Sequence, residues 1–137
     1  MNDLRQEIIK KASLKCQEYL TTEIPTENKA KAVGINYLRF AIEQPQLFRL
    51  LFMTDNQTRA NIYETDIAMS NKIIISTIQE LYKIPYEMAR QLTVNMWLLT
   101  HGIATIIVCG TAQFSMEQIS KIMTNTFDGL LKELKGG

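Results

Sequence analysis

The stretch that decides the fold reads MWLLTHGIATIIV, residues 96–108. It is the most apolar part of the chain, but it is far shorter than the about 20 apolar residues that a membrane-spanning helix needs. Two threonines, a histidine and a glycine also interrupt it. At about 100° per residue, Trp97 and His101 lie on one side of a helix, whereas Leu99 and Ile103 lie on the other. The stretch therefore predicts a buried helix with two apolar sides.

The residues around this stretch predict where two helices begin and end. Pro85 suits the first turn of the helix, and Gly110 is placed to terminate it. Ser115 and Gln118 have the spacing of a capping box, which predicts the start of a last helix. Its apolar residues recur at steps of three and four and cover about half of the circumference. One neighbouring helix does not need so wide a face.

The rest of the chain reads helical as well, because no period-two alternation lasts long enough to indicate a strand. A short apolar piece after Pro45 is too short to be stable alone and is expected to be tucked into the core. The sequence predicts an all-α, antiparallel bundle of about six helices, forming a single domain over residues 1–137. The expected segments are 2–20, 26–44, 47–53, 59–82, 85–108 and 116–134.

Composition excludes several classes of function. The 137 residues are 46% hydrophobic and 21% charged, with 15 Lys+Arg against 14 Asp+Glu. A net charge of +1 with scattered lysines argues against nucleic-acid binding by this chain itself. Cys16 and Cys109 lie within apolar helical stretches and the N-terminus has no signal-peptide pattern, so a cytoplasmic protein with buried free thiols is expected. A single histidine and no catalytic motif predict no metal, no cofactor and no enzyme.

Two helices with two apolar sides each require a second partner surface. The simplest partner is an identical copy, docked about a two-fold axis as a four-helix interface of the last two helices. Gly102 in mid-helix supports a close helix crossing there, because glycine is otherwise unfavourable in a helix. The predicted dimer interface comprises Leu99, Gly102, Ile103, Ile106, Ile119, Met123 and Phe127.

Two motifs resemble a known family. The pattern Trp97-x-x-x-His101-Gly102, followed by an apolar run and an amphipathic last helix, resembles the C-terminal domain of TetR-family transcriptional regulators, in the subgroup with a Trp-His-Gly signature. The stretch GINYLRFAIEQPQLFRLLF, residues 34–52, looks like the helix-Pro-Leu-Phe element of the same family, in the expected order.

The resemblance implies an effector-binding and dimerisation domain of a repressor. In that family a three-helix DNA-binding head comes before a linking helix, and residues 2–4 resemble the start of that helix. The head is therefore expected to be absent here, so operator DNA would be bound only through it. The resemblance further implies that a bound effector changes the pitch of the linking helix and thereby the affinity for DNA.

Aromatic and thioether side chains are typical of an adaptable apolar ligand cavity, although each of them also suits a plain core. His101 is either a satisfied buried histidine or a hydrogen-bonding group in the pocket wall, and Trp97 is either core or wall. Thr100 either faces solvent or binds a ligand. A helical protein-interaction module without a small molecule is the alternative function. The predicted pocket for a hydrophobic or aromatic effector comprises Tyr37, Phe40, Phe52, Ile67, Met96, Trp97, Thr100 and His101.

Overall fold

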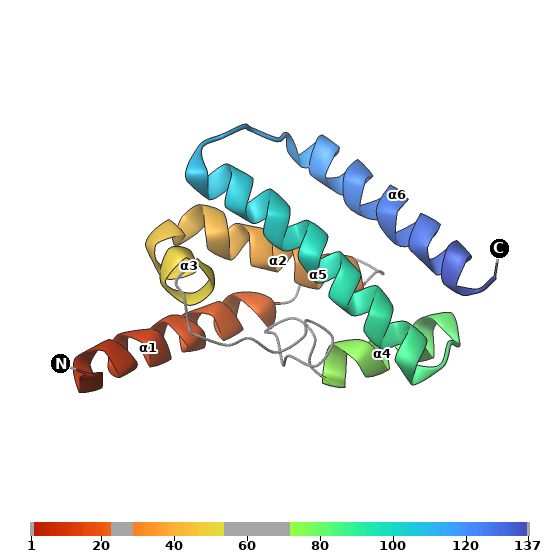
Figure 1. Ribbon diagram of the computed structural model, residues 1–137, viewed down its shortest axis with the longest axis horizontal. Helices are drawn as coiled ribbons and strands as arrows, with labels where there is room; N and C mark the ends of the chain where they lie inside the picture. Colours follow the sequence, from red (N-terminus) through yellow and green to blue (C-terminus); the bar gives the residue numbers. More distant parts are fainter. Residues whose placement is uncertain (1, 23–28, 54–71, 137) are drawn as a thin grey trace.

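The computed structural model describes residues 2–22, 29–53 and 72–136. Within these ranges the chain forms six helices and no strand, which confirms the predicted all-α class (Figure 1). The predicted start of the fourth helix at residue 59 or 60 lies outside the described residues, as does Ile67. The helices are α1 (Asn2–Leu20), α2 (Lys29–Glu43), α3 (Pro45–Phe52), α4 (Lys72–Tyr82), α5 (Tyr86–Cys109) and α6 (Met116–Leu134).

The longest described helix, α5, runs through the middle of the molecule, with α6 alongside it and α2 across it (Figure 1). It packs against α2, α4 and α6. Among the described residues, α5 is the one helix long and apolar enough to cross a membrane. Its contacts with three other helices are those of a central core helix, as the interrupted stretch 96–108 predicts.

Local chemistry sets the boundary between α5 and α6 where it was predicted. Gly110 adopts the left-handed conformation with φ of 73°, which glycine reaches without strain, and its N–H caps the last turn of α5. Ser115 Oγ accepts a hydrogen bond from the backbone N–H of Gln118 at 3.1 Å, and Gln118 Oε1 accepts one from the backbone N–H of Ser115 at 2.8 Å. The predicted capping box is therefore confirmed.

Pro45 separates two helices and also begins the second of them. Helix α2 ends at Glu43, and Pro45 is the first residue of α3, where its missing N–H leaves no donor unpaired. The short apolar piece is thus helical, and Phe48 on its inner face is fully buried.

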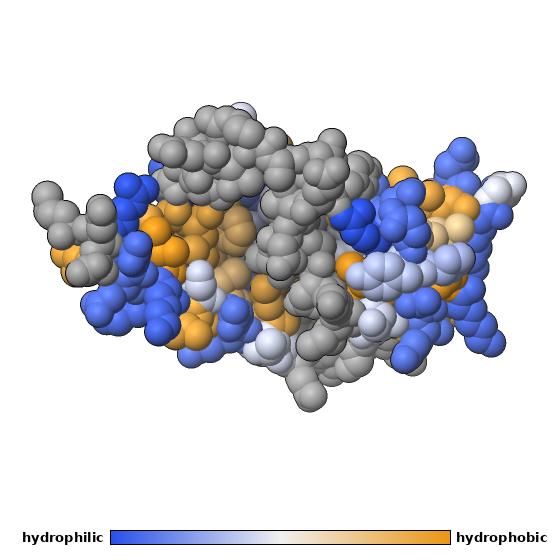
Figure 2. Space-filling view, turned by 60° about the horizontal axis from the view of Figure 1, so that its bottom comes forward, coloured by the Kyte–Doolittle hydropathy of each residue, from blue (hydrophilic) through white to orange (hydrophobic). Residues whose placement is uncertain are grey.

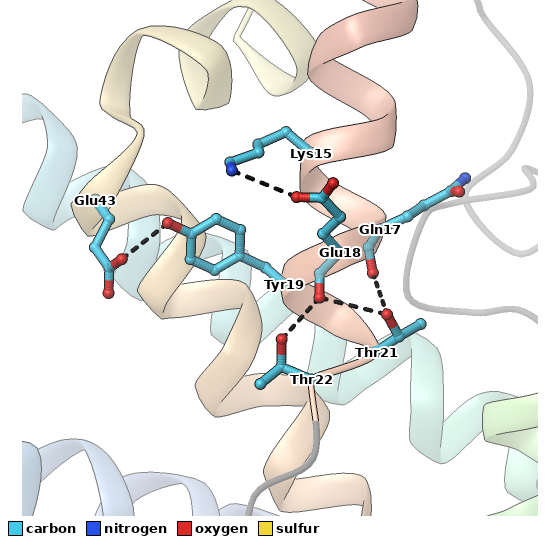
Figure 3. Close-up of polar contacts among 7 residues, drawn as sticks. All are labelled: Lys15, Gln17, Glu18, Tyr19, Thr21, Thr22 and Glu43. Carbon is cyan, nitrogen blue, oxygen red and sulfur yellow. Dashed lines mark hydrogen bonds and ion pairs between the residues drawn. The ribbon is translucent and has the colours of Figure 1, made fainter.

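Helix α1 is joined to the C-terminal end of α2 by a hydrogen bond, which Figure 3 shows, and by an aromatic contact. The hydroxyl of Tyr19 donates to Glu43 Oε1 at 2.8 Å, and the ring of Tyr19 meets the edge of Phe40 with centroids 5.5 Å apart. At the end of α1, the hydroxyls of Thr21 and Thr22 donate to backbone carbonyls of the last turn. These contacts place α1 against the helix that carries Tyr37.

Two clusters of buried residues form the core of the described chain. The larger one joins α1, α2, α3, α5 and α6 and includes Tyr37, Phe48 and Ile119. The smaller one lies where α4, α5 and α6 meet, and we call it the Phe127 cluster; it comprises Ile75, Ile78, Ile84, Ala89, Leu92 and Phe127.

The apolar stripe of α6 packs against its own chain. Ile119, Met123 and Phe127 are buried, with Ile119 only 1% exposed, and Ile103 of α5 is buried as well. Their side chains fill the core of one chain, so they are not on an outer surface that a second copy could contact. Of the residues predicted to form a dimer interface, those left partly exposed are Leu99, Gly102 and Ile106.

Candidate functional site

The site begins with a hydrogen bond between α2 and α5. The hydroxyl oxygen of Tyr37 lies 2.7 Å from Nδ1 of His101, although the two residues are 64 positions apart in the chain. Tyr37 is fully buried, whereas His101 is partly exposed. Both residues were predicted to line a pocket, and the structure brings them into direct contact.

Burial favours the neutral forms of both groups in the contact between Tyr37 and His101. Desolvation lowers the pKa of His101, which favours the neutral imidazole at neutral pH. Desolvation, followed by the nearby Cys16, raises the pKa of Tyr37, so the phenol keeps its proton. Among the described residues, Nδ1 of His101 is the one hydrogen-bond partner of this hydroxyl. Nδ1 of the neutral imidazole can accept this proton, and in that arrangement the imidazole proton is on Nε2.

Trp97 stacks on the imidazole. It lies one helical turn before His101, where side chains four residues apart are neighbours. The ring centroids are 4.8 Å apart and the planes differ by 13°. The indole Nε1 is buried, and none of the described residues accepts a hydrogen bond from it. A buried N–H without an acceptor is costly, so this atom is a second polar feature of the site.

Helix α3 supplies two phenylalanine rings. The centroids of Phe48 and Phe52 are 5.7 and 5.9 Å from that of His101, and the two rings are 5.4 Å from each other. Phe52 also lies 5.4 Å from the ring of Tyr37. We call this group the His101 cluster; it comprises Tyr37, Phe48, Phe52, Trp97 and His101.

Phe48 was not among the predicted pocket residues. Its spacing of four from Phe52 could have indicated it, because both fall on one side of a helix. The sequence did not show that this side would face His101.

Other predicted pocket residues lie elsewhere. Phe40 is buried, and its aromatic neighbour is Tyr19 of α1. Thr100 is buried, and its hydroxyl donates to the carbonyl of Met96 within α5 at 2.8 Å. Met96 is partly buried and packs against both core clusters. The structure thus brings together Tyr37, Phe52, Trp97 and His101 of the predicted set.

The described residues contain no group of three or more His, Cys, Asp or Glu side chains that could hold a metal ion. Burial raises the pKa of Cys16 to about 11, so its thiol stays protonated and weakly nucleophilic at neutral pH. What the His101 cluster offers is a set of aromatic surfaces with two ring N–H groups, which is suited to binding.

The described residues form an all-α domain, and the family follows from the sequence comparison. A family model described as "Tetracyclin repressor-like, C-terminal domain" matches residues 30–130. The chain belongs to this family, whose members are effector-binding and dimerisation domains of soluble transcriptional regulators. The matched region contains all five residues of the His101 cluster. No curated protein and no solved structure matches the chain.

Proposed function

We propose that this chain is the effector-binding and dimerisation domain of a cytoplasmic TetR-like repressor. It binds a small hydrophobic or aromatic molecule at the His101 cluster and forms a homodimer. Operator DNA is bound by an N-terminal head that residues 1–137 do not include. No catalytic role is assigned to the chain.

The hydrogen bond between Tyr37 and His101 is the single observation that carries this function. Polar groups buried among aromatic rings cost free energy unless they are paired, and an apolar core of the same size needs none. His101 is nevertheless placed among four rings and kept partly exposed. A polar group in an apolar, accessible position can orient a ligand, which is how small-molecule sites obtain specificity.

The cluster is connected to the helix that would transmit the signal. Tyr37 lies on α2, and α2 holds α1 through the contact of Tyr19 with Glu43. Helix α1 also contacts α3, which supplies Phe48 and Phe52. A ligand that shifts α2 or α3 would therefore change the position of α1, the proposed linking helix.

The proposed dimer uses the outer side of α5. Leu98 is exposed, and Leu99 and Ile106 are partly exposed. Apart from Gly102, its two chain neighbours and the nearby backbone of α5, no atom of the described residues lies within 4 Å of the position that a Cβ on Gly102 would take. This open position leaves room for a helix of a second copy to approach the backbone of α5. Light scattering at micromolar concentration tests the dimer, and a monomeric mass would contradict it.

The ligand-binding part is tested by thermal unfolding of the chain with and without small aromatic molecules such as indole, naphthalene and acetophenone. A molecule that binds the folded state alone raises the melting temperature as its concentration exceeds the dissociation constant. Chemical-shift changes of the single histidine and single tryptophan would place the binding at the His101 cluster. The function is contradicted if no aromatic molecule raises the melting temperature or moves those signals.

One observation favours the alternative of a helical protein-interaction module. Leu4 and Ile8 lie one turn apart at the start of α1 and are exposed, Leu4 by 64%. In Figure 2 hydrophobic surface is visible toward the end of the molecule where α1 lies. A partner helix could cover it. In that case Leu4→Glu with Ile8→Glu would abolish partner binding, and aromatic molecules would leave the melting temperature unchanged.

A further inference from the structure

The His101 cluster presents two ring N–H groups. With Tyr37 donating to Nδ1 of His101, the imidazole is a donor at Nε2, and the indole of Trp97 is a donor at Nε1. None of the described residues accepts a hydrogen bond from either nitrogen. The two rings are stacked with their centroids 4.8 Å apart, so the buried indole N–H and the imidazole of the partly exposed His101 lie close together on α5. Among the described residues, this site has donors without acceptors.

Among the described residues, the ring contacts of the imidazole are with uncharged aromatic side chains. The rings of Phe48, Phe52 and Tyr37 face the imidazole, and no charged side chain among the described residues pairs with His101 or Trp97. A carboxylate placed there would lose its hydration without gaining a cation, which is strongly unfavourable. A carbonyl oxygen accepts two hydrogen bonds through its two lone pairs and brings no charge.

We propose that the ligand is a neutral aromatic carbonyl compound, whose oxygen accepts hydrogen bonds from His101 Nε2–H and Trp97 Nε1–H while its ring lies against the phenylalanines of α3. This inference rests on the proposed effector-binding function and specifies the chemistry of the effector. Tyr37 acts as a positioning residue, because its hydroxyl holds the imidazole in the tautomer that donates from Nε2.

The tautomer is tested first, and without any ligand. The chain has one histidine and one tryptophan, so each ring nitrogen gives a single assignable ¹⁵N signal. At neutral pH, a protonated Nε2 and an unprotonated Nδ1 are expected for His101. In Tyr37→Phe the two tautomers should become mixed. A proton on Nδ1 in the unmodified chain would overturn the inference.

The ligand class is tested with three molecules of nearly the same shape, namely acetophenone, ethylbenzene and benzoate. Acetophenone should move the N–H signals of both Trp97 and His101 downfield, because both form new hydrogen bonds. Ethylbenzene can occupy the same apolar surface but has no acceptor, so neither signal should move downfield. Benzoate should bind more weakly than acetophenone. Tighter binding of benzoate would identify an anion site and overturn the inference.

The decisive quantity is the ratio of the dissociation constants of ethylbenzene and acetophenone. Ethylbenzene is more hydrophobic than acetophenone, and this difference alone affects the ratio. The ratio of the unmodified chain is therefore compared with the ratio of each variant. In His101→Phe, which keeps a ring and removes the donor, the ratio should fall about ten-fold. Thr93→Val is the matched control, since it removes a buried hydroxyl of α5 that bonds to its own helix at Ala89. Its ratio should equal that of the unmodified chain.

The results distinguish a failure of the carbonyl inference from a failure of the proposed effector-binding function. If acetophenone and ethylbenzene both bind and the ratio is the same in His101→Phe, the carbonyl inference fails and effector binding stands. If none of the aromatic molecules binds, the proposed function fails together with the inference. Should His101→Phe not fold, Tyr37→Phe replaces it, and a ratio that falls about two- to three-fold supports the inference. An unchanged ratio in Tyr37→Phe overturns it.

Discussion

The His101 cluster and the Phe127 cluster pack against the same helix but differ in chemistry. Helix α5 gives Trp97 and His101 to the first, and Ala89 and Leu92 to the second. Every buried member of the Phe127 cluster is apolar, including Phe127 itself at 6% exposed. The His101 cluster contains a phenol, an imidazole and an indole N–H.

This difference shows that polar groups are not needed to pack α5. The Phe127 cluster packs α4, α5 and α6 together through buried apolar side chains, whose removal from water is favourable. Burying the polar groups of the His101 cluster costs free energy. The hydrogen bond between Tyr37 and His101 offsets part of that cost. Under the proposed function, specific recognition of a ligand accounts for this arrangement.

The largest effect is expected in the Phe127 cluster. Phe127→Ala removes a buried ring that lies 5.1 Å from the ring of Tyr82, and it should lower the free energy of unfolding by about 3–5 kcal/mol. Chemical denaturation measures this loss. The ¹⁵N signals of His101 and Trp97 should stay where they are below the transition. A loss of less than about 1 kcal/mol would show that the cluster does not carry the packing assigned to it.

A smaller effect is expected from a matched pair of tyrosine variants. Tyr37→Phe removes only the hydroxyl that bonds to His101 and should lower the free energy of unfolding by about 1 kcal/mol. Tyr82→Phe, beside Phe127, should change it by less than about 0.5 kcal/mol, since that hydroxyl has no hydrogen bond within the described chain. Equal effects in urea denaturation would remove the distinction between the two clusters.

A pair of glycine variants tests what covers α5 next to His101. Gly102→Ala and Gly129→Ala both place a methyl group that, apart from its chain neighbours and its own helix backbone, has no atom of the described residues within 4 Å. In one isolated chain, each should stabilise its helix by about 0.5–1 kcal/mol. Gly102→Ala should instead weaken the proposed dimer, as measured by sedimentation at several concentrations, while Gly129→Ala should not. An unaltered dimerisation constant in Gly102→Ala would move the proposed interface away from this position.

The smallest effect is a difference in pH dependence. Because burial lowers the pKa of His101 from 6.5, the unfolded chain binds more protons than the folded chain between the lowered value and 6.5. The free energy of unfolding should therefore fall as the pH is lowered through that window, and be unaffected by this group above it. His101→Phe should lack this component of the slope. Identical pH profiles for the two proteins in thermal unfolding would contradict the burial assigned to His101.

The sequence predicted most of what depends on neighbouring residues. The end of α5 at Gly110 and the capping box at Ser115 follow from local backbone and side-chain chemistry, and both are confirmed. The contact between Tyr37 and His101 was not predicted as a pair, although both residues were expected near a pocket. Sixty-four positions separate them, and periodicity carries no information about which helices meet.

The apolar face of α6 shows the limit most clearly. The repeat of three and four identified Ile119, Met123 and Phe127 as one buried side, and that side is buried. This side was predicted to contact a second copy, whereas in the structure it is buried against helices of the same chain. Hydrophobic periodicity indicates which side of a helix is buried, but it does not indicate which surface packs against that side.

The amino-acid sequence by itself determined the helices of the described chain, their principal ends and the family to which the chain belongs, because caps, breakers and motifs act over a few residues. Only the tertiary structure decided that α3 turns Phe48 and Phe52 toward His101, and that the hydroxyl of Tyr37 lies 2.7 Å from its Nδ1. The physical reason is that a hydrogen bond and a ring contact depend on distances of a few ångströms between helices remote in the chain. Those distances are set by the packing of the whole core.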